Sequence, residues 1–502
     1  MIFGKLTLEA AVLGLSIYDG FGKFSFYFLP HFSSHFLVPS FQKNVKLLLL
    51  GIVPVFWLWH TCKMSKTIQS LQLNRLLPAI RNDFSNTSEI RSTDASDFQY
   101  PLADVLMSGL AMMFLQDPSL LEFQRRLEER RRNNNLKTIF GVENVPKETQ
   151  FRDILDSADP SEVQLPFKTL IHALQQTRLW SKFRVLDGRY AVLMDGFEFF
   201  RSDKCGCKHC LENKHKDGRV DYAHKCLAVT LAHPTIKLPI PILLEEIKQE
   251  DGKVKQDCEF NAAKRVIPAL AKFYPHLDMI IIGDGLFSKT PMVLEALNAG
   301  LSYIFVAKPS DHTTLEKDLA GLRTCEGVEK LEIKASDGTK LVYEWAKNIE
   351  LNGSSDQKTN WFGYTEISAK GQIIYRNSWV TNIKPTRKNI QELVEVGRHR
   401  WQIENQAFNV LKNHGHHLEH NFGHGKNNLA FIFIVLNFLA YMLHQILRLA
   451  DKLLVAVQER MGTRYRLWDD IRVLFNHFVW GSWDALLEHM LDYRDDTGLE
   501  SG

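Results

Sequence analysis

The chain has 502 residues, of which 45% are hydrophobic and 24% charged, and its mean hydropathy is −0.19. These values fit a soluble multidomain protein with several cores. The formal net charge of +3 does not by itself indicate a nucleic-acid binder, so local clusters must carry any such argument. Seven cysteines, an odd number in so long a chain, argue against a disulfide scaffold and favour a reducing compartment.

Residues 1–63 differ in composition from the rest of the chain. They are rich in Phe and Leu, poor in acids, and include an apolar run over residues 47–59 that Gly51 and Pro54 interrupt. This run is short for a membrane span, which needs about 20 residues, and the segment lacks the early basic region of a signal peptide. We interpret it as an upstream extension from a misplaced start codon before Met64, with a membrane anchor as the alternative.

Residues 64–186 are expected to form a helical DNA-binding domain. Apolar residues recur at spacings of three and four over residues 100–134, and residues 117–119 (Asp-Pro-Ser) form a stop and restart signal. An arginine row follows, interleaved with Glu128 and Glu129. It predicts either a grip on a DNA backbone or a solvated helix face. The row consists of Arg125, Arg126, Arg130, Arg131 and Arg132.

Beyond residue 186 the periodicity changes to that of an α/β domain. Three strands, a helix, a strand, a helix and a strand follow one another, which is the order of a ribonuclease-H-like mixed sheet. In that topology the first and fourth strands are neighbours. Residues 187–314 are therefore expected to be the first part of such a core. The expected elements are strands 189–195, 225–232 and 236–246, helix 257–275, strand 279–284, helix 290–300 and strand 302–309.

Three further segments complete the expected organisation. Residues 315–383 alternate between apolar and polar positions and predict a β-rich insertion. Residues 384–483 complete the core with a helix over 386–412 and a long apolar helix over 429–457. Charged or His-rich segments bracket the apolar helix, which favours a core helix over a membrane span. Residues 484–502 are expected to be an acidic tail.

Three acidic residues stand where the expected elements would aim them at one point. Asp195 and Asp284 close the first and fourth strands, and Glu404 lies on the helix over 386–412. A carboxylate at the end of a buried strand is unfavourable unless a cation or a donor meets it. Three convergent carboxylates predict a site for two Mg²⁺ or Mn²⁺ ions that acts on a phosphodiester. Basic and aromatic residues flank the glutamate, namely Arg398, His399, Arg400 and Trp401.

The motifs around these acids resemble those of one enzyme family. MDGFEFF, IIGDGLFS followed by VAKPSDH, and GRHRWQIENQAFNVLK together resemble the DDE transposases of bacterial insertion sequences with a β insertion before the glutamate. The resemblance covers residues 64–455, and RWQIEN is its most specific element. It implies that Asp195, Asp284 and Glu404 are the catalytic and metal-binding acids, and that Arg400 is the arginine four residues before the glutamate.

The sequence departs from the family pattern at two positions. The signature tyrosine three residues before Arg400 is Gly397, and the lysine seven residues after Glu404 is Leu411, with Lys412 one residue later. Both departures concern contacts to the phosphates of the transposon ends.

The resemblance implies a DNA transposase that binds the terminal inverted repeats of its element, cuts there and joins the ends to target DNA. Double-stranded DNA is the expected partner, with a homodimer on paired ends, no membrane, and a cytoplasmic, nucleoid-associated location in bacteria. A catalytically inactive DNA-binding protein descended from a transposase is the alternative. The residues expected to contact DNA are Arg398, Arg400, Trp401 and Lys412.

A second constellation surrounds the sequence CGCKHC. Cys205, Cys207, Cys210 and Cys226 are candidate ligands of a structural Zn²⁺, and His224 is an alternative fourth ligand. Because no second pair of closely spaced cysteines accompanies the first, a reduced hairpin without metal is equally open.

Two further aromatic features have alternative interpretations. The histidines of KNHGHHLEHNFGHG are expected to cap the glutamate helix or to touch DNA rather than to bind a metal. Trp361 is interpreted as a core residue of the β insertion, with stacking on a flipped base as the alternative. The histidines are His414, His416, His417, His420 and His424.

Overall fold

The computed structural model describes most of the chain beyond residue 68. The described residues are 69–92, 98–127, 130–249, 256–351 and 357–492. The interpretations of residues 1–63 lie outside this part of the chain.

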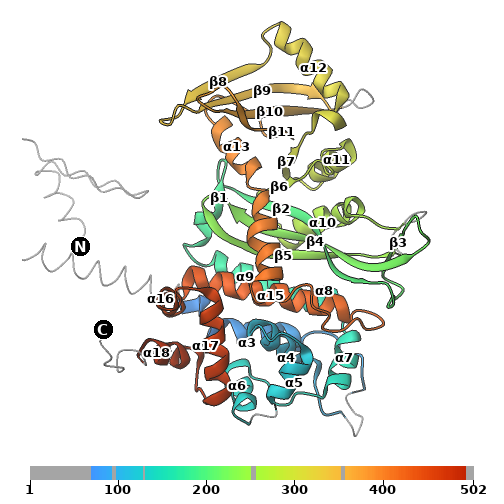
Figure 1. Ribbon diagram of the computed structural model, residues 1–502, viewed down its shortest axis with the longest axis vertical. Helices are drawn as coiled ribbons and strands as arrows, with labels where there is room; N and C mark the ends of the chain where they lie inside the picture. The colour runs from blue at the N-terminus through green and yellow to red at the C-terminus, as the bar shows by residue number, and fades with distance from the viewer. Residues whose placement is uncertain (1–68, 93–97, 128–129, 250–255, 352–356, 493–502) are drawn as a thin grey trace, which may run out of the picture. The chain divides into compact units, whose positions relative to one another are not determined.

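The described strands form one mixed sheet of eleven, with the order β3-β4-β2-β6-β7-β11-β10-β9-β8, while β1 pairs with β2 and β5 with β4 (Figure 1). Helices pack against this sheet, so the predicted α/β class is confirmed. The strands are β1 (Arg184–Val185), β2 (Arg189–Ser202), β3 (Leu211–Lys214), β4 (Val220–His233), β5 (Ile236–Ile247), β6 (Met279–Gly283), β7 (Ser302–Val306), β8 (Glu329–Lys334), β9 (Lys340–Glu350), β10 (Lys358–Ile367) and β11 (Ile373–Thr381).

The first and fourth predicted strands lie side by side at the centre of the sheet. β2 pairs antiparallel with β4 and parallel with β6, and β6 pairs parallel with β7. All five residues of β6 are buried, as expected for a parallel strand covered on both faces. The predicted neighbour relation is therefore confirmed. Two helices connect the parallel strands, α10 (Glu259–Phe273) before β6 and α11 (Thr290–Asn298) before β7.

The predicted insertion is β-rich and extends the same sheet. After α12 (Thr313–Thr324), β8 to β11 pair antiparallel with one another, and β11 then pairs antiparallel with β7, with Trp379 opposite Val306. Trp361 is only 4% exposed, which confirms its interpretation as a core residue.

The helical segment before the sheet and the helices at the end of the chain share one hydrophobic core. Helix α15 packs against α4, α7 and β5, and α17 packs against α6 (Figure 1). The N-terminal helices are α3 (Leu73–Ser85), α4 (Leu102–Phe114), α5 (Leu120–Leu127), α6 (Arg130–Phe140), α7 (Glu148–Asp156), α8 (Pro160–Val163) and α9 (Leu165–Gln175). The C-terminal helices are α15 (Leu429–Ala450), α16 (Lys452–Met461), α17 (Arg464–His477) and α18 (Trp483–Asp492).

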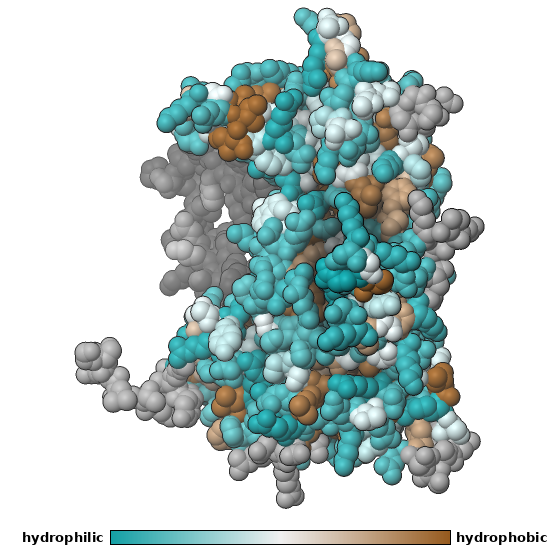
Figure 2. All heavy atoms as spheres, turned by 45° about the vertical axis from the view of Figure 1, so that its right-hand side comes forward, coloured by the Kyte–Doolittle hydropathy of each residue, from teal (hydrophilic) through white to brown (hydrophobic). Residues whose placement is uncertain are grey.

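Helix α15 is long and apolar enough to cross a membrane, with 22 residues, but 94% of its most apolar window is buried inside the fold. It therefore belongs to the core, as predicted. The face drawn in Figure 2 is mostly hydrophilic, with hydrophobic residues in small separate groups.

Two predicted boundaries at this end of the chain are wrong. The helix expected over residues 429–457 is divided at Asp451, whose carboxylate accepts hydrogen bonds from the amides of Leu453 and Leu454 and begins α16. The tail expected from residue 484 is helical up to residue 492, because the apolar face of α18 is buried against the core.

Two buried histidines stand where the C-terminal helices meet α4. His444 Nε2 donates to the carbonyl oxygen of Phe114 at 3.0 Å, so His444 Nδ1 accepts from His416 Nε2 at 3.3 Å. Both rings are thus neutral. Burial lowers the pKa of His416 to about 3 and also lowers the pKa of His444.

These histidines predict a loss of stability in mild acid. Below the unfolded-state pKa of about 6.5, each histidine binds a proton only when the chain unfolds. Each further fall of one pH unit therefore lowers the free energy of unfolding by about 1.4 kcal/mol per histidine. Urea unfolding at about pH 5.5 should therefore show a free energy of unfolding about 3 kcal/mol lower than at about pH 7.5. An equal pH dependence in a His416→Asn, His444→Gln double variant would contradict this account.

Candidate active site

Asp195 lies in the middle of β2 rather than at the end of a strand as predicted, because β2 continues to Ser202, and Asp284 directly follows β6, the parallel neighbour of β2. Leu193 of β2 pairs with Ile282 of β6, and each aspartate comes two residues after its member of this pair. The two aspartates are therefore at the same level. Since alternate residues share a face of a sheet, both carboxylates leave the sheet on the same side. The strand pairing therefore juxtaposes the two predicted aspartates.

Glu404 comes to these aspartates from a segment that is not one continuous helix. The helix expected over residues 386–412 is divided into α13 (Ile390–Arg398), a turn, the π-helix η5 (Ile403–Phe408) and α14 (Asn409–Asn413). Single π-helical turns are frequent at functional sites. Glu404 lies in the first turn of η5.

Arg400 joins the glutamate to the first aspartate. Its Nη1 atom donates to Glu404 Oε1 at 2.5 Å and to Asp195 Oδ2 at 3.2 Å. The predicted placement of Arg400 and Glu404 on one face is confirmed by this contact. The side chain of Asp195 is 17% exposed and that of Glu404 is 48% exposed, so the group opens to solvent on the glutamate side.

The electrostatics of the group favour an additional cation. Burial raises the pKa of Asp195 to about 7; Arg400 opposes this rise, while Glu404 and Asp284 add to it by repulsion. One guanidinium thus does not compensate the convergent carboxylates. A divalent cation bound there would stabilise their ionised forms.

A fourth acid, Glu259 in the first turn of α10, was not identified from the sequence. Gly196 makes room for it, because a Cβ atom at that position would lie 2.3 Å from the Glu259 carboxyl group. Burial, followed by repulsion from Asp284, raises the pKa of Glu259. In the sequence Glu259 is indistinguishable from the many acids that favour a helix N-terminus, so it gave no usable signal.

A lysine also borders Asp284. A Cβ atom on Gly285 would lie 3.3 Å from Cδ and Cε of Lys308, so the lysine side chain crosses the backbone just after the aspartate. The loop that carries Lys308 is fixed to the loop after Asp284 by the buried contact between Ser288 Oγ and His312 Nε2 at 2.7 Å. Lys308 was not identified from the sequence, although it lies in the motif VAKPSDH, which could have indicated it.

Arg398, one of the residues predicted to contact DNA, is partly buried against the β insertion. It forms an ion pair with Glu366, and its guanidinium lies 5.1 Å from the ring centre of Tyr364 and 4.4 Å from that of Tyr375. These contacts fix α13 against β10 and β11. Arg398 thus connects the β insertion to the segment that leads to Glu404.

The other residues expected to contact DNA have different surroundings. Lys412 Nζ lies 2.8 Å from Glu419 Oε1, and its side chain is 31% exposed. Trp401 is 40% exposed and lies near the ring of His399. Trp401 therefore offers a large aromatic surface to solvent beside Arg400.

The two positions at which the sequence departs from the resemblance, Gly397 and Leu411, are both closely packed. A Cβ atom at Gly397 would lie 3.0 Å from the ring of the fully buried Trp379, so α13 approaches β11 too closely for a tyrosine. Leu411 is fully buried. The π-helical segment η5, in which a turn contains one residue more than in an α-helix, lies between Arg400 and Lys412.

The structure brings together three of the five candidate zinc ligands, Cys207, Cys210 and His224. Cys207 and Cys210 lie with His224 and His424 in a group whose ligand atoms are all within 4.8 Å of one another. Cys226 is buried within β4, where its thiol donates to the carbonyl oxygen of Leu227, so it lies outside the group.

The group also corrects two other interpretations. Cys205 is exposed and contacts only the outer ring nitrogen of His424, at 3.6 Å between Sγ and Nδ1. His424 neither caps the glutamate helix nor faces outward, as was expected of the histidine-rich segment. His414 does end α14, as its C-cap residue.

No protein-family model matches the chain, and no curated protein matches it. The arrangement of the described residues is therefore the basis for the functional proposal.

Proposed function

We propose that this chain is a DDE transposase, a metal-dependent enzyme that cuts DNA at the terminal inverted repeats of its own element and joins the ends to target DNA. The observation that carries the proposal is the convergence of three acids from distant segments. Asp195 and Asp284 leave neighbouring strands at one level, and Arg400 links Glu404 to Asp195.

The order of the strands supports a ribonuclease-H-like core for this enzyme. Strands β5, β4 and β2 are successive antiparallel neighbours, and β2, β6 and β7 are successive parallel neighbours. The helices α10 and α11 stand before β6 and β7 in the chain, as the predicted order requires.

The donor set fits Mg²⁺ or Mn²⁺. Asp195, Asp284 and Glu404 offer only carboxylate oxygens, which these hard cations prefer. When bound, two such ions would favour a deprotonated nucleophile and stabilise the leaving oxygen of a phosphodiester.

The residues of the chain have separable roles in this proposal. Arg400 holds two of the acids in place, and its fork of donors can exchange a carboxylate for a phosphate oxygen when DNA arrives. Lys308 borders Asp284 from the other side, where a phosphate would approach. Trp401 presents an exposed ring to the bound strand. Assembly as a homodimer on paired ends, and a cytoplasmic location on the nucleoid, belong to the same proposal.

Cleavage of the DNA that flanks this chain's own gene tests the proposal. Purified protein should cut a labelled duplex at the element end in Mg²⁺ or Mn²⁺, and not in chelator, because the carboxylates need a metal ion to act on a phosphodiester. Specific binding of these ends without any cutting in either metal would instead identify a catalytically inactive DNA-binding protein.

A further inference from the structure

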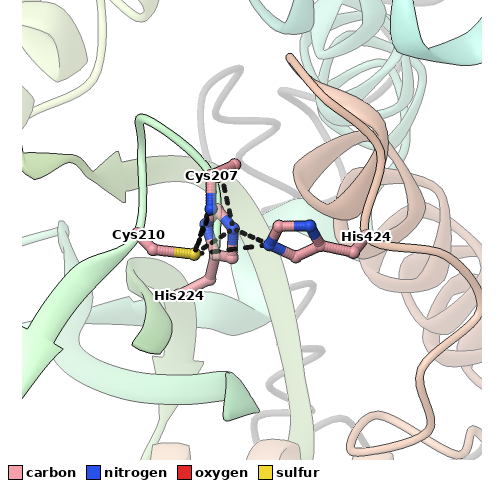
Figure 3. A group of neighbouring side chains, drawn as sticks. All are labelled: Cys207, Cys210, His224 and His424. Carbon is pink, nitrogen blue, oxygen red and sulfur yellow. Dashed lines mark hydrogen bonds between the residues drawn. The ribbon is translucent and has the colours of Figure 1, made fainter. Parts of the chain in front are cut away.

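The Cys/His group lies outside the candidate active site and has the dimensions of a tetrahedral metal site. Figure 3 shows Cys207, Cys210 and His224 facing the ring of His424, which reaches in from a different part of the chain. The two sulfur atoms are 3.7 Å apart, and the Nε2 atoms of the two histidines are 3.2 Å apart. Cys210 Sγ lies 3.3 Å from His224 Nε2 and 3.3 Å from His424 Nε2, and Cys207 Sγ lies 3.5 Å from His224 Nε2.

These separations match the edges of a zinc tetrahedron. Bond lengths of about 2.3 Å to sulfur and about 2.05 Å to nitrogen give edges of about 3.8 Å between sulfurs, about 3.6 Å from sulfur to nitrogen and about 3.3 Å between nitrogens. Each measured separation lies within about 0.3 Å of its ideal edge. A disulfide is absent from this pair, because its sulfurs would be only about 2.05 Å apart.

The loop that carries the two cysteines is already shaped around the sulfur atoms. The amide of Cys207 donates to Cys210 Sγ at 3.4 Å, and the amide of Cys210 donates to the carbonyl oxygen of Cys207 at 3.1 Å. Backbone donors to sulfur favour the thiolate, which is the form that binds metal.

A buried carboxylate orients one of the imidazoles. Glu246 Oε1 lies 3.2 Å from His224 Nδ1, and both side chains are almost fully buried. A carboxylate on the outer ring nitrogen fixes the tautomer and leaves Nε2 free as a ligand. The His224 Nε2 atom faces both sulfur atoms. This is the outer partner that metal-binding histidines usually have.

The group is closed rather than catalytic. Cys210 and His224 are buried, and the rings of Phe199 and Phe200 pack against His224. Two sulfurs and two nitrogens complete a tetrahedron, so substrate would find no open position.

We propose that Cys207, Cys210, His224 and His424 bind one structural Zn²⁺ that fastens the segment after Glu404 to the sheet that carries Asp195. Cys207 and Cys210 follow β2, His224 lies on β4 and His424 lies beyond α14. Thiolates with imidazoles select zinc over Mg²⁺, which prefers oxygen. The metal thus connects β2 and β4 to the segment that follows Glu404, whereas Arg400 precedes Glu404 in the sequence. Any effect of this metal on DNA cutting rests on the proposed function. The metal site itself does not depend on that proposal.

Elemental analysis of protein purified without chelator tests the site. We expect about one zinc per chain, and less than about a tenth of that in a Cys207→Ser, Cys210→Ser double variant, because zinc affinity depends on the thiolates. Cys258→Ser is the matched control, since Cys258 is exposed and lies outside the group; it should retain the zinc. A zinc-free wild-type chain, or equal zinc in the double variant, would overturn the proposal.

Two single variants keep the test informative if the double variant fails to fold. His424→Ala should lower the zinc content, whereas His424→Cys should retain it by offering a thiolate. After exchange to Co²⁺, the wild type should show the visible absorption of a tetrahedral site, and His424→Cys should show a stronger sulfur-to-cobalt band. Unchanged spectra in both variants would exclude His424 as a ligand. Zinc that is present in a chain that cuts no DNA would uphold this site and overturn only the proposed function.

Discussion

Asp195→Asn is expected to lower the rate of metal-dependent DNA cleavage by a factor on the order of 10³ or more, because the carboxylate is needed to hold the metal ions. Asp284→Asn and Glu404→Gln should have effects of the same order. Binding to the element ends should remain nearly intact, since the acids hold metal rather than DNA. A strand-cleavage assay and a gel-shift assay on the same duplex measure the two effects.

The same substitution should not destabilise the metal-free protein. Burial and neighbouring carboxylates raise the pKa of Asp195 to about 7, so its charge is unfavourable there without a cation. Asp195→Asn should leave the thermal midpoint unchanged or slightly higher. Glu198→Gln is the matched control, because Glu198 lies on the same strand and pairs with Arg201. Cleavage by Asp195→Asn at a rate close to that of the control would rule out the assignment.

Asp156→Ala is expected to lower the free energy of unfolding by about 3 kcal/mol, since a carboxylate that caps a buried helix is lost. Asp156 ends α7, and its two oxygens accept from the backbone amides of residues 426–429 at 2.9–3.2 Å. These residues lead into α15, in which 19 of the 22 residues are buried. Removing the carboxylate leaves the donors at the start of this helix without their partner.

The capping interaction also predicts a pH dependence of the free energy of unfolding measured in urea. Burial opposes ionisation of Asp156, but the backbone donors outweigh it and lower the pKa. The stabilisation is therefore present at neutral pH and is lost as the pH falls through the lowered pKa, so the difference between wild type and variant should shrink in acid. Asp153→Ala, on the exposed face of the same helix, is the control. A loss no greater than that of the control would contradict this role.

The sequence was sufficient to predict the central strands and the two aspartates. Each aspartate ends an apolar run, and the order of strands and helices allows few topologies, so β2 and β6 become neighbours. In the register of that pairing, Asp195 and Asp284 are at the same level. Arg400 and Glu404, four residues apart, lie on one face in helical structure of either kind.

Other parts of the site depend on packing that the sequence does not reveal. The helix expected over residues 386–412 is divided at η5, and no residue in the sequence signals that division. His424 lies about two hundred residues from its partner ligands, too far for any motif of spaced cysteines and histidines. Glu259 approaches Asp284 in space, and its carboxyl group fits there because Gly196 has no side chain.

Locating the bound metal tests the central claim most directly. Crystals of the protein with its element ends and Mn²⁺ should give anomalous density in contact with carboxylate oxygens of Asp195, Asp284 and Glu404. Arg400 should then contact a phosphate in place of Asp195, since the metal replaces its charge. Manganese bound elsewhere, with Arg400 still between Asp195 and Glu404 while DNA occupies the site, would contradict the account.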